Sequence, residues 1–309
     1  MKMNIIFMGT PKFAVPSLDI LIRNNYNISA VVTQPDKPAG RGLQLQSSEI
    51  KKFANSKNLR ILQPEDLKNK DFAEKIKELN PDLIIVVAYR ILPPEIFNIP
   101  KFGAINLHAS LLPKYRGAAP INWAIINGET ETGVTTFFIK EKVDTGNIIL
   151  QKKIKIEFDD NAGTLHDKLS IIGAEALLET VKLIEDGSVR TFPQDDNLVS
   201  KAPKIQKSDC KINWGKKSID IYNFIRGLSP TPCSFTHFGN KILKIYTSKI
   251  TDRKSINAPG SVTVENKNIF VDTSDYQLQI LELQLEGKKK LNAENFINGL
   301  NKKENLIFI

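Results

Sequence analysis

The chain has 309 residues, of which 41% are hydrophobic and 25% charged, and its formal net charge is +9. This composition is typical of a globular protein, and the length allows two domains with well-buried cores. No membrane span is expected, because the longest apolar run, 83–89, is far shorter than the ~20 residues that a spanning helix needs. The chain start predicts a strand rather than a signal peptide, which favours a cytoplasmic protein. Cys210 and Cys233 have no metal-ligand spacing, so neither a disulfide framework nor zinc is expected.

The positive charge is concentrated in the last third of the chain. Residues 201–309 contain 18 Lys and Arg against 10 Asp and Glu, whereas the rest contains 25 against 24. Such a basic module favours a polyanionic partner, because neutralising phosphates supplies affinity that does not depend on sequence. A lysine-rich composition imposed by a low-GC genome is the alternative explanation.

The first 33 residues predict a strand, a tight loop, a helix and a second strand. The apolar run 2–8 ends in Gly9-Thr10-Pro11, apolar residues recur at helical spacing over 13–22, and 28–33 is again apolar. This start is shared by dinucleotide-binding folds. That function is excluded here because the loop has one glycine instead of G-x-G-x-x-G and no acidic residue closes the second strand.

Residues 34–101 continue the alternation of helices and strands. The stretch 34–46 holds two prolines, two glycines and no periodicity, which predicts a surface loop. Helices are expected at 48–56 and 71–79, and strands at 60–63 and 83–88. The last strand is almost wholly apolar, as in a parallel sheet covered by helices on both faces.

The strand 102–107 leads into a polar cluster where chemistry is expected. Asn106 and His108 lie two apart, so their side chains point to the same face of an extended chain. An amide donor and an imidazole together suit the stabilisation of an oxyanion and the movement of a proton. A histidine taken alone is more often packed or solvated than catalytic. Asp144, in a break between apolar runs, is by itself ordinary turn chemistry.

The remaining elements predict a boundary between two domains. A helix is expected at 120–126, strands at 134–139 and 148–158, and a long helix over 165–184. The weakly periodic stretch 189–209 predicts a linker between domains 1–188 and 210–309. The second domain has a helix at 219–228 and five short strands at 234–238, 241–246, 261–265, 269–272 and 277–284, which favour a small OB-like β-barrel.

Several separated motifs, in order, resemble one family. These are MGTPKFAVPSL (8–18), VVTQPDKPAGRG (31–42), NLHASLLPKYRGAAPINWAI (106–125), GETETGVTTF (128–137) and DTG (144–146). The chain is similar to the methionyl-tRNA formyltransferase family of 10-formyltetrahydrofolate-dependent enzymes from about residue 3 to its end. The resemblance implies an α/β fold, with a Rossmann-like, mostly parallel sheet that binds no nucleotide, followed by the OB-like barrel.

The resemblance also implies site residues. Asn106, His108 and Asp144 match the family's formyl-transfer centre. The folate site would comprise Tyr89, Arg90, Ile91, Leu92, Ser110, Leu111, Leu112 and Pro113. The tRNA and substrate contacts would comprise Thr10, Phe13, Lys37 and Arg41. One segment departs from the family pattern, because Ala88-Tyr89-Arg90-Ile91-Leu92-Pro93 is one residue shorter than Ala-Tyr-Gly-x-x-Leu-Pro and lacks its glycine.

The implied reaction moves a formyl group from 10-formyltetrahydrofolate to the α-amino group of methionyl initiator tRNA, without a metal, in a monomer. Two alternatives come from other classes: a related folate enzyme with a small acceptor or a hydrolase, and a non-catalytic RNA-binding protein. Arg41 between two glycines and the basic second domain argue against a small acceptor. An amide, an imidazole and a carboxylate in this order argue against simple binding.

Overall fold

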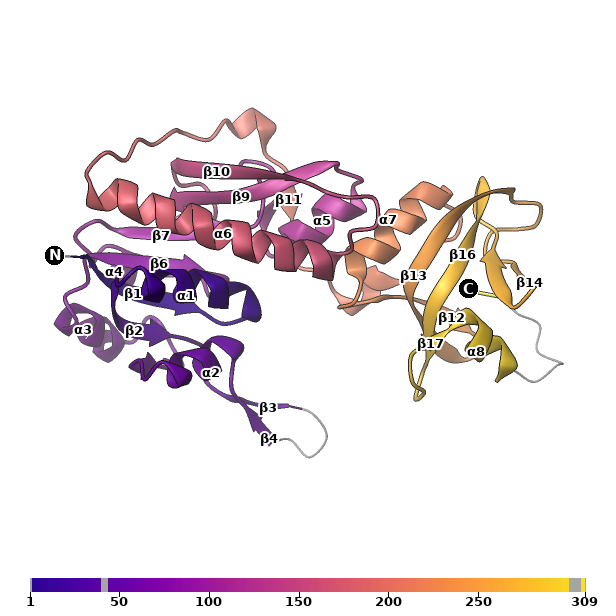
Figure 1. Ribbon diagram of the computed structural model, residues 1–309, viewed down its shortest axis with the longest axis horizontal. Coiled ribbons are helices and arrows are strands. Elements are labelled where there is room, and N and C mark those ends of the chain that lie inside the picture. Colours follow the sequence, from indigo (N-terminus) through magenta and orange to yellow (C-terminus); the bar gives the residue numbers. More distant parts are fainter. Residues whose placement is uncertain (1, 40–43, 300–306, 309) are drawn as a thin grey trace. The chain divides into compact units, whose positions relative to one another are not determined.

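The computed structural model describes residues 2–39, 44–299 and 307–308 and divides into two compact units (Figure 1). The first unit comprises Met1–Gly117, Thr132–Ile154 and His166–Lys201. The second comprises Ala118–Glu131, Lys155–Leu165 and Ala202–Ile309. The second unit therefore includes two short segments, 118–131 and 155–165, that come before the end of the first unit in the sequence. The domain limits 1–188 and 210–309 stay a prediction.

A seven-stranded sheet forms the first unit. Its strands, in order across the sheet, are β10 (Ile148–Lys155), β9 (Glu131–Phe138), β7 (Ala104–His108), β6 (Leu83–Val87), β1 (Asn4–Gly9), β2 (Asn27–Val32) and β5 (Ile61–Leu62). The strands from β7 to β5 pair in parallel, whereas β9 is antiparallel to β7. The prediction of a mostly parallel sheet is confirmed.

Helices bury both faces of this sheet. Alternate residues of β1 and β6, including Ile6, Met8 and Ile84, pack with Phe72 of α3 and Ile96 of α4 in one apolar cluster. Leu107 points to the opposite face, since its side chain lies against Gly173 of α6. The helices of this unit are α1 (Val15–Arg23), α2 (Glu49–Ser56), α3 (Lys70–Glu78), α4 (Pro94–Phe97) and most of α6 (Ala162–Glu185).

The predicted loop 34–46 has regular structure at its base. Lys37–Ala39 (β3) pairs antiparallel with Gln44–Gln46 (β4), with Lys37 opposite Gln46. Asp36, just before β3, accepts a hydrogen bond from Lys51 Nζ at 2.6 Å, and both side chains are partly buried. The side chains of Lys51 and Gln63 lower the pKa of Asp36 below its usual value. Charge pairing therefore fixes the start of this hairpin.

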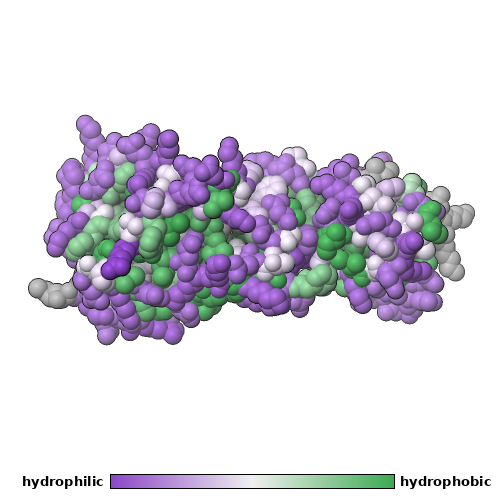
Figure 2. Space-filling view, turned by 90° about the horizontal axis from the view of Figure 1, so that it is seen from above, coloured by the Kyte–Doolittle hydropathy of each residue, from purple (hydrophilic) through white to green (hydrophobic). Residues whose placement is uncertain are grey.

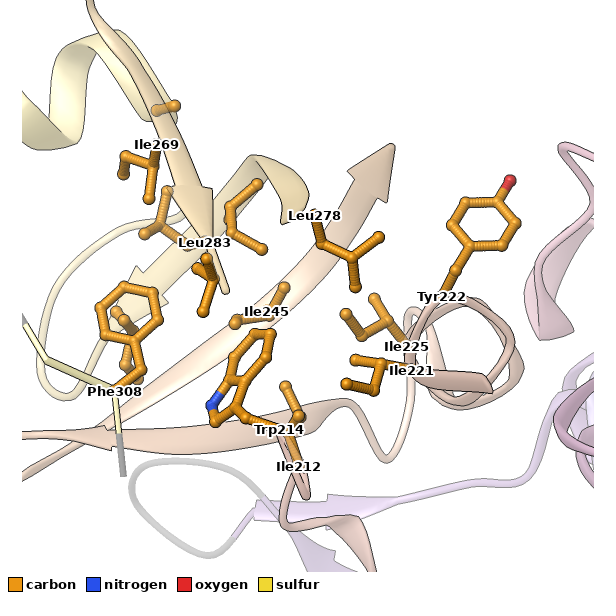
Figure 3. Close-up of a cluster of buried hydrophobic side chains, with 14 of the residues drawn as sticks. Ile212, Trp214, Ile221, Tyr222, Ile225, Ile245, Ile269, Leu278, Leu283 and Phe308 are labelled. Carbon is orange, nitrogen blue, oxygen red and sulfur yellow. The ribbon is translucent and has the colours of Figure 1, made fainter. Parts of the chain in front are cut away.

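The second unit contains an antiparallel sheet over an apolar core. Its strands run in the order β12 (Ser234–Phe238), β13 (Lys241–Lys254), β16 (Tyr276–Leu285), β15 (Asn268–Val271) and β14 (Val262–Glu265), with β17 (Leu291–Asn292) beside β16. The helices of the unit are α5 (Pro120–Ile126), α7 (Ser218–Leu228) and α8 (Ala293–Asn298). Figure 3 shows Ile221 and Ile225 of α7 pointing toward Leu278, with Trp214 beside Ile245.

The prediction of an OB-like barrel is not confirmed, because this sheet stays open. β12 and β14 are its two edges, and no ladder of the described residues joins one to the other. Two isolated bridges join residues 307–308 to both edges of the sheet. Phe308 pairs with Phe238 at the end of β12, and Ile307 pairs with Ser261 just before β14. The five predicted strands are present, but β13 continues eight residues beyond the predicted end at 246.

The remaining short elements are β8 (Arg116–Gly117), β11 (Lys201–Ala202), η1 (Lys12–Ala14), η2 (Asp196–Leu198) and η3 (Lys207–Cys210).

On the face drawn in Figure 2, hydrophobic residues gather in a broad area in the left part of the view, and hydrophilic residues surround this area. Among the described residues no helix combines the length and the apolar character needed to cross a membrane.

Candidate active site

Strand β7 carries Asn106 and His108 to the carboxyl edge of the parallel strands. Asn106 lies opposite Phe137 of β9, and His108 lies opposite Thr135. Both residues belong to a regular strand, so their side chains lie on the same face of the sheet, as predicted. Asn106 is half-buried, whereas only 6% of the His108 surface is exposed. The two polar groups therefore lie at the edge where open α/β sheets bind ligands.

The imidazole of His108 is fixed by a backbone carbonyl. Its Nε2 lies 2.9 Å from the carbonyl oxygen of Tyr115, in a buried contact. A carbonyl only accepts hydrogen bonds, so we assign the proton of the neutral ring to Nε2. Its Nδ1 lies 3.8 Å from Oδ2 of Asp144. The ring therefore presents Nδ1 as the atom that can take up and release a proton beside a carboxylate.

Asp144 is itself held in place by the backbone. The residue is 8% exposed and has a φ of +55°, in the left-handed region that few side chains adopt. The backbone N–H of Gly117 donates to its Oδ2 at 2.9 Å. At Gly146, two residues on, an added Cβ would lie 1.5 Å from the carbonyl oxygen of Phe138. The turn that carries the carboxylate thus needs glycine for close packing.

The side chain of Asn106 makes no hydrogen bond to any residue that the structure describes. A half-buried amide without a protein partner retains both its donor and its acceptor capacity. It can therefore donate to an oxygen of a bound molecule.

The segment after His108 is locked by hydroxyl and amide groups, of which sequence reasoning missed those of Thr135 and Gln151. Ser110 is fully buried, and its Oγ donates to the carbonyl of Lys114 at 2.6 Å. Thr135 Oγ1 donates to the carbonyl of Ser110 at 2.7 Å and accepts from the N–H of Leu112 at 3.0 Å. Gln151 donates to the carbonyl of Leu112 at 2.9 Å. Leu112 is buried, Leu111 and Pro113 are half-buried, and the Leu112–Pro113 peptide bond is cis.

The predicted folate residues at 89–92 divide into buried and open positions. Leu92 is 5% exposed and belongs to the apolar cluster beneath α3 and α4, whereas Ile91 is 70% exposed. The guanidinium of Arg90 donates to the carbonyls of Pro64 and Glu65 and to the hydroxyl of Tyr89, at 2.6–2.9 Å. Burial raises the pKa of Tyr89 above its usual value, which Arg90 partly opposes. Arg90 thus fastens the shortened segment to residues 64–65.

The four predicted tRNA and substrate residues have different surroundings. Oγ1 of Thr10 is buried without a hydrogen-bond partner among the described residues. Phe13 is 5% exposed, and its ring meets the ring of His166 edge to face, with 5.3 Å between centroids. Lys37 is exposed on β3, and Arg41 lies outside the described residues.

Comparison with protein families identifies the class of protein to which this fold and this site belong. The formyl transferase model matches residues 1–181, and the model of the formyl transferase C-terminal domain matches residues 204–301. The chain therefore belongs to the formyl transferase family.

Within this family, strongly similar relatives share one name. A methionyl-tRNA formyltransferase of Thermodesulfovibrio yellowstonii is 49% identical over 300 residues, which cover 97% of this chain and 96% of the relative. A methionyl-tRNA formyltransferase of Flavobacterium johnsoniae is 47% identical over 304 residues, covering 97% and 96%. The chain therefore matches these relatives over nearly their whole length.

A solved structure shares the fold. The crystal structure of HypX from Aquifex aeolicus in complex with tetrahydrofolic acid superposes with a TM-score of 0.68 at 16% sequence identity. The match covers 98% of this chain and 48% of HypX, so the chain spans about half the length of that protein. At this identity the likeness concerns the fold alone.

Proposed function

We propose that the protein transfers the formyl group of 10-formyltetrahydrofolate to the α-amino group of methionyl initiator tRNA. The observation that carries this proposal is the approach of His108 to Asp144, on the strand edge that also bears Asn106, in a chain of the formyl transferase family. The name of the full-length relatives supports methionyl-tRNA as the acceptor.

The three side chains have distinct parts in the proposed reaction. The amine attacks the formyl carbon, a C–N bond forms, and the formyl oxygen becomes an oxyanion to which Asn106 donates. His108 takes the amine proton at Nδ1, because its Nε2–H is engaged by the Tyr115 carbonyl. The carboxylate of Asp144 stabilises the resulting imidazolium across 3.8 Å. The proton then passes to N10 of the folate as the original C–N bond breaks.

The folate donor would meet an amide that makes no hydrogen bond to the described residues. This amide belongs to Asn106, so it can donate to the formyl oxygen of the donor. The exposed side chain of Ile91 offers apolar area at the end of β6. These features support a folate site formed by residues 89–92 and 110–113, with 10-formyltetrahydrofolate supplying an already activated formyl group. Groups of His, Cys, Asp and Glu that could hold a metal are absent from the described residues.

A tRNA acceptor is supported by charge. The last third of the chain carries 18 basic against 10 acidic residues, and Lys37 is exposed beside the segment that contains Arg41. Such groups contact phosphates without reading sequence. We further propose an OB-like arrangement for the second unit, supported by the two bridges of residues 307–308. Use of a tRNA substrate supports a cytoplasmic site of action, and the monomeric state stays a prediction.

The test is single-turnover transfer of labelled formyl from 10-formyltetrahydrofolate to methionyl initiator tRNA. Methionyl elongator tRNA and free methionine serve as comparison acceptors. We expect rapid transfer to the initiator and slow transfer to the other two. Release of formate without transfer to any of these acceptors would indicate a hydrolase instead.

A further inference from the structure

One glutamine of the predicted linker has unusual surroundings. Residues 191–193 and 195–198 are exposed, but Gln194 between them is half-buried. Sequence reasoning assigned this residue no role. Its burial in an otherwise exposed segment indicates a specific set of contacts.

The amide of Gln194 uses its full hydrogen-bonding capacity on two other segments. Its Nε2 donates to the carbonyl of Asp144 at 2.9 Å and to the carbonyl of Gly146 at 2.8 Å. Its Oε1 accepts from Nε of Arg116 at 3.0 Å and from Nη2 of the same guanidinium at 2.7 Å. Two donors and two acceptor sites are all that such an amide offers.

These contacts join the two chain segments that determine where the Asp144 carboxylate lies. One segment is the turn 144–146, whose first residue has the left-handed φ of +55° and therefore needs support from outside. The other is β8, where Gly117 donates its N–H to Oδ2 of Asp144 and Arg116 precedes it. The same segment, 115–117, also supplies the carbonyl that fixes His108.

We propose that Gln194 is a positioning residue, which holds the turn 144–146 against β8 so that the Asp144 carboxylate faces Nδ1 of His108. The inference rests on the proposed formyl transfer and assigns Gln194 no contact with substrate. Freed of this amide, the turn can relax and the carboxylate moves away from the imidazole. Displacements of about 1 Å in a catalytic group reduce turnover up to ~10²-fold.

Two substitutions separate this role from simple anchoring of Arg116. Gln194→Met keeps the length of the side chain and removes all four hydrogen bonds. Gln194→Glu keeps an acceptor, now charged, for Arg116 but sets a carboxylate oxygen against two carbonyl oxygens. If Gln194 served Arg116, the Glu variant would be nearly normal and the Met variant slow. If it holds the turn, the Glu variant is at least as slow as the Met variant.

The first readout is single-turnover formyl transfer with initiator tRNA. We expect both variants to transfer about tenfold more slowly than wild type, with KM for each substrate changed less than about twofold. The matched control is Asp196→Asn, which removes only the exposed 3.2 Å pair with Arg116 and is expected to leave the rate unchanged.

The second readout does not depend on activity. The chain has three histidines, 108, 166 and 237, so ¹⁵N imidazole spectra can assign each ring by substitution. In both Gln194 variants we expect the His108 nitrogens to shift, because the neighbouring carboxylate moves. Unchanged signals from His166 and His237 show that the variants are folded.

The possible failures are distinguishable. A wild-type protein that transfers no formyl group to tRNA contradicts the proposed function, whatever the variants do. A wild type that transfers, together with Gln194 variants of normal rate and unshifted His108 signals, overturns the positioning role alone. A slow Met variant with a normal Glu variant overturns it as well, in favour of the Arg116 anchor.

Discussion

Different kinds of contact stabilise two separate regions: the proposed catalytic edge of the first unit, with His108, Asp144 and Gln194, and the antiparallel sheet of the second unit. At the edge, side chains bond to backbone groups: His108 to the carbonyl of Tyr115, Asp144 to the N–H of Gly117, and Gln194 to two carbonyls. In the second unit, fully buried aliphatic residues such as Leu243, Leu278 and Leu283 pack in one cluster.

This difference determines what each region tolerates. A core of aliphatic side chains loses stability in proportion to the volume removed and leaves polar geometry elsewhere intact. A site built on carbonyls and N–H groups depends on the path of the backbone, so a change that moves a turn by a small distance affects activity first. The predictions that follow test this contrast, beginning with the largest effect.

Gly146→Ala is expected to be the most damaging substitution at the catalytic edge. The added Cβ would lie 1.5 Å from the Phe138 carbonyl oxygen, so the turn must move. We expect a loss of more than about 3 kcal/mol in the free energy of unfolding, measured in urea, and loss of transfer. Gly187→Ala is the control: nothing lies within 4 Å and φ is +67°, so only the strain of about 1–2 kcal/mol remains. Equal effects of the two substitutions would contradict the close packing at Gly146.

Asn106→Ala should separate activity from stability. Because its amide makes no hydrogen bond to a described residue, we expect the free energy of unfolding to change by less than about 0.5 kcal/mol. Turnover should fall roughly 10²–10³-fold through loss of the oxyanion donor. The matched control is Asn4→Ala, whose Nδ2 donates to the carbonyls of Leu79 and Asn80 at 2.7 and 3.0 Å. It should lose about 1 kcal/mol of stability and no activity. A near-normal rate for folded Asn106→Ala removes Asn106 from the mechanism.

Leu283→Ala should destabilise the second unit without altering the catalytic edge. Its side chain is fully buried, and truncation is expected to remove about 3 kcal/mol from the free energy of unfolding of that unit. Both tryptophans, Trp123 and Trp214, belong to the second unit, so their fluorescence in urea follows its unfolding. The exposed Lys249, changed to Ala, should stay within about 0.5 kcal/mol of wild type. A shift of the His108 ¹⁵N signals in Leu283→Ala would show that the two regions are not independent.

The smallest expected effect is alkaline destabilisation through Cys233. Burial raises the pKa of this thiol to about 11, above its usual value near 9. Since the folded value is the higher one, the thiol's contribution to stability is complete below pH 9 and is lost as pH rises toward 11. The free energy of unfolding in urea should decrease between pH 8 and pH 10.5 in both proteins. We expect this decrease to be roughly 1–2 kcal/mol smaller for Cys233→Ala than for wild type. Parallel pH profiles for the two proteins would contradict the raised pKa.

The sequence was informative wherever periodicity or motif determined the structure. The helix predicted at 48–56 differs from α2 by one residue at its start, and the helix predicted at 71–79 differs from α3 by one residue at each end. All five predicted strands of the second unit are present. The length of β13 was missed because its second half, 247–254, is mostly polar and makes its pairing with β16 through the backbone. The spacing of Asn106 and His108 predicted a common face in an extended chain, and β7 includes both residues, one residue beyond the predicted strand end at 107.

The supports of the site could not be predicted from the sequence. Gln194 bonds to backbone carbonyls 48 and 50 residues away, and any residue type supplies a carbonyl. Thr135 lay within a recognised motif, but its bond to the Ser110 carbonyl depends on the antiparallel register of β7 and β9. Arg90 stands where the family pattern has glycine, and only the structure shows that it reaches Pro64 and Glu65.

The early segment within the second unit constrains how the chain folds during synthesis. Ile125 of α5 is fully buried, and Asn122 and Trp123 donate to carbonyls of Gly227 and Pro203 at 2.7 and 2.8 Å. These partners are made after α5, because the ribosome synthesises proteins from the amino terminus. A nascent chain that has reached the end of α6 therefore exposes an apolar helix whose partners do not yet exist. We expect chaperones to bind that intermediate, and a fragment ending there to aggregate.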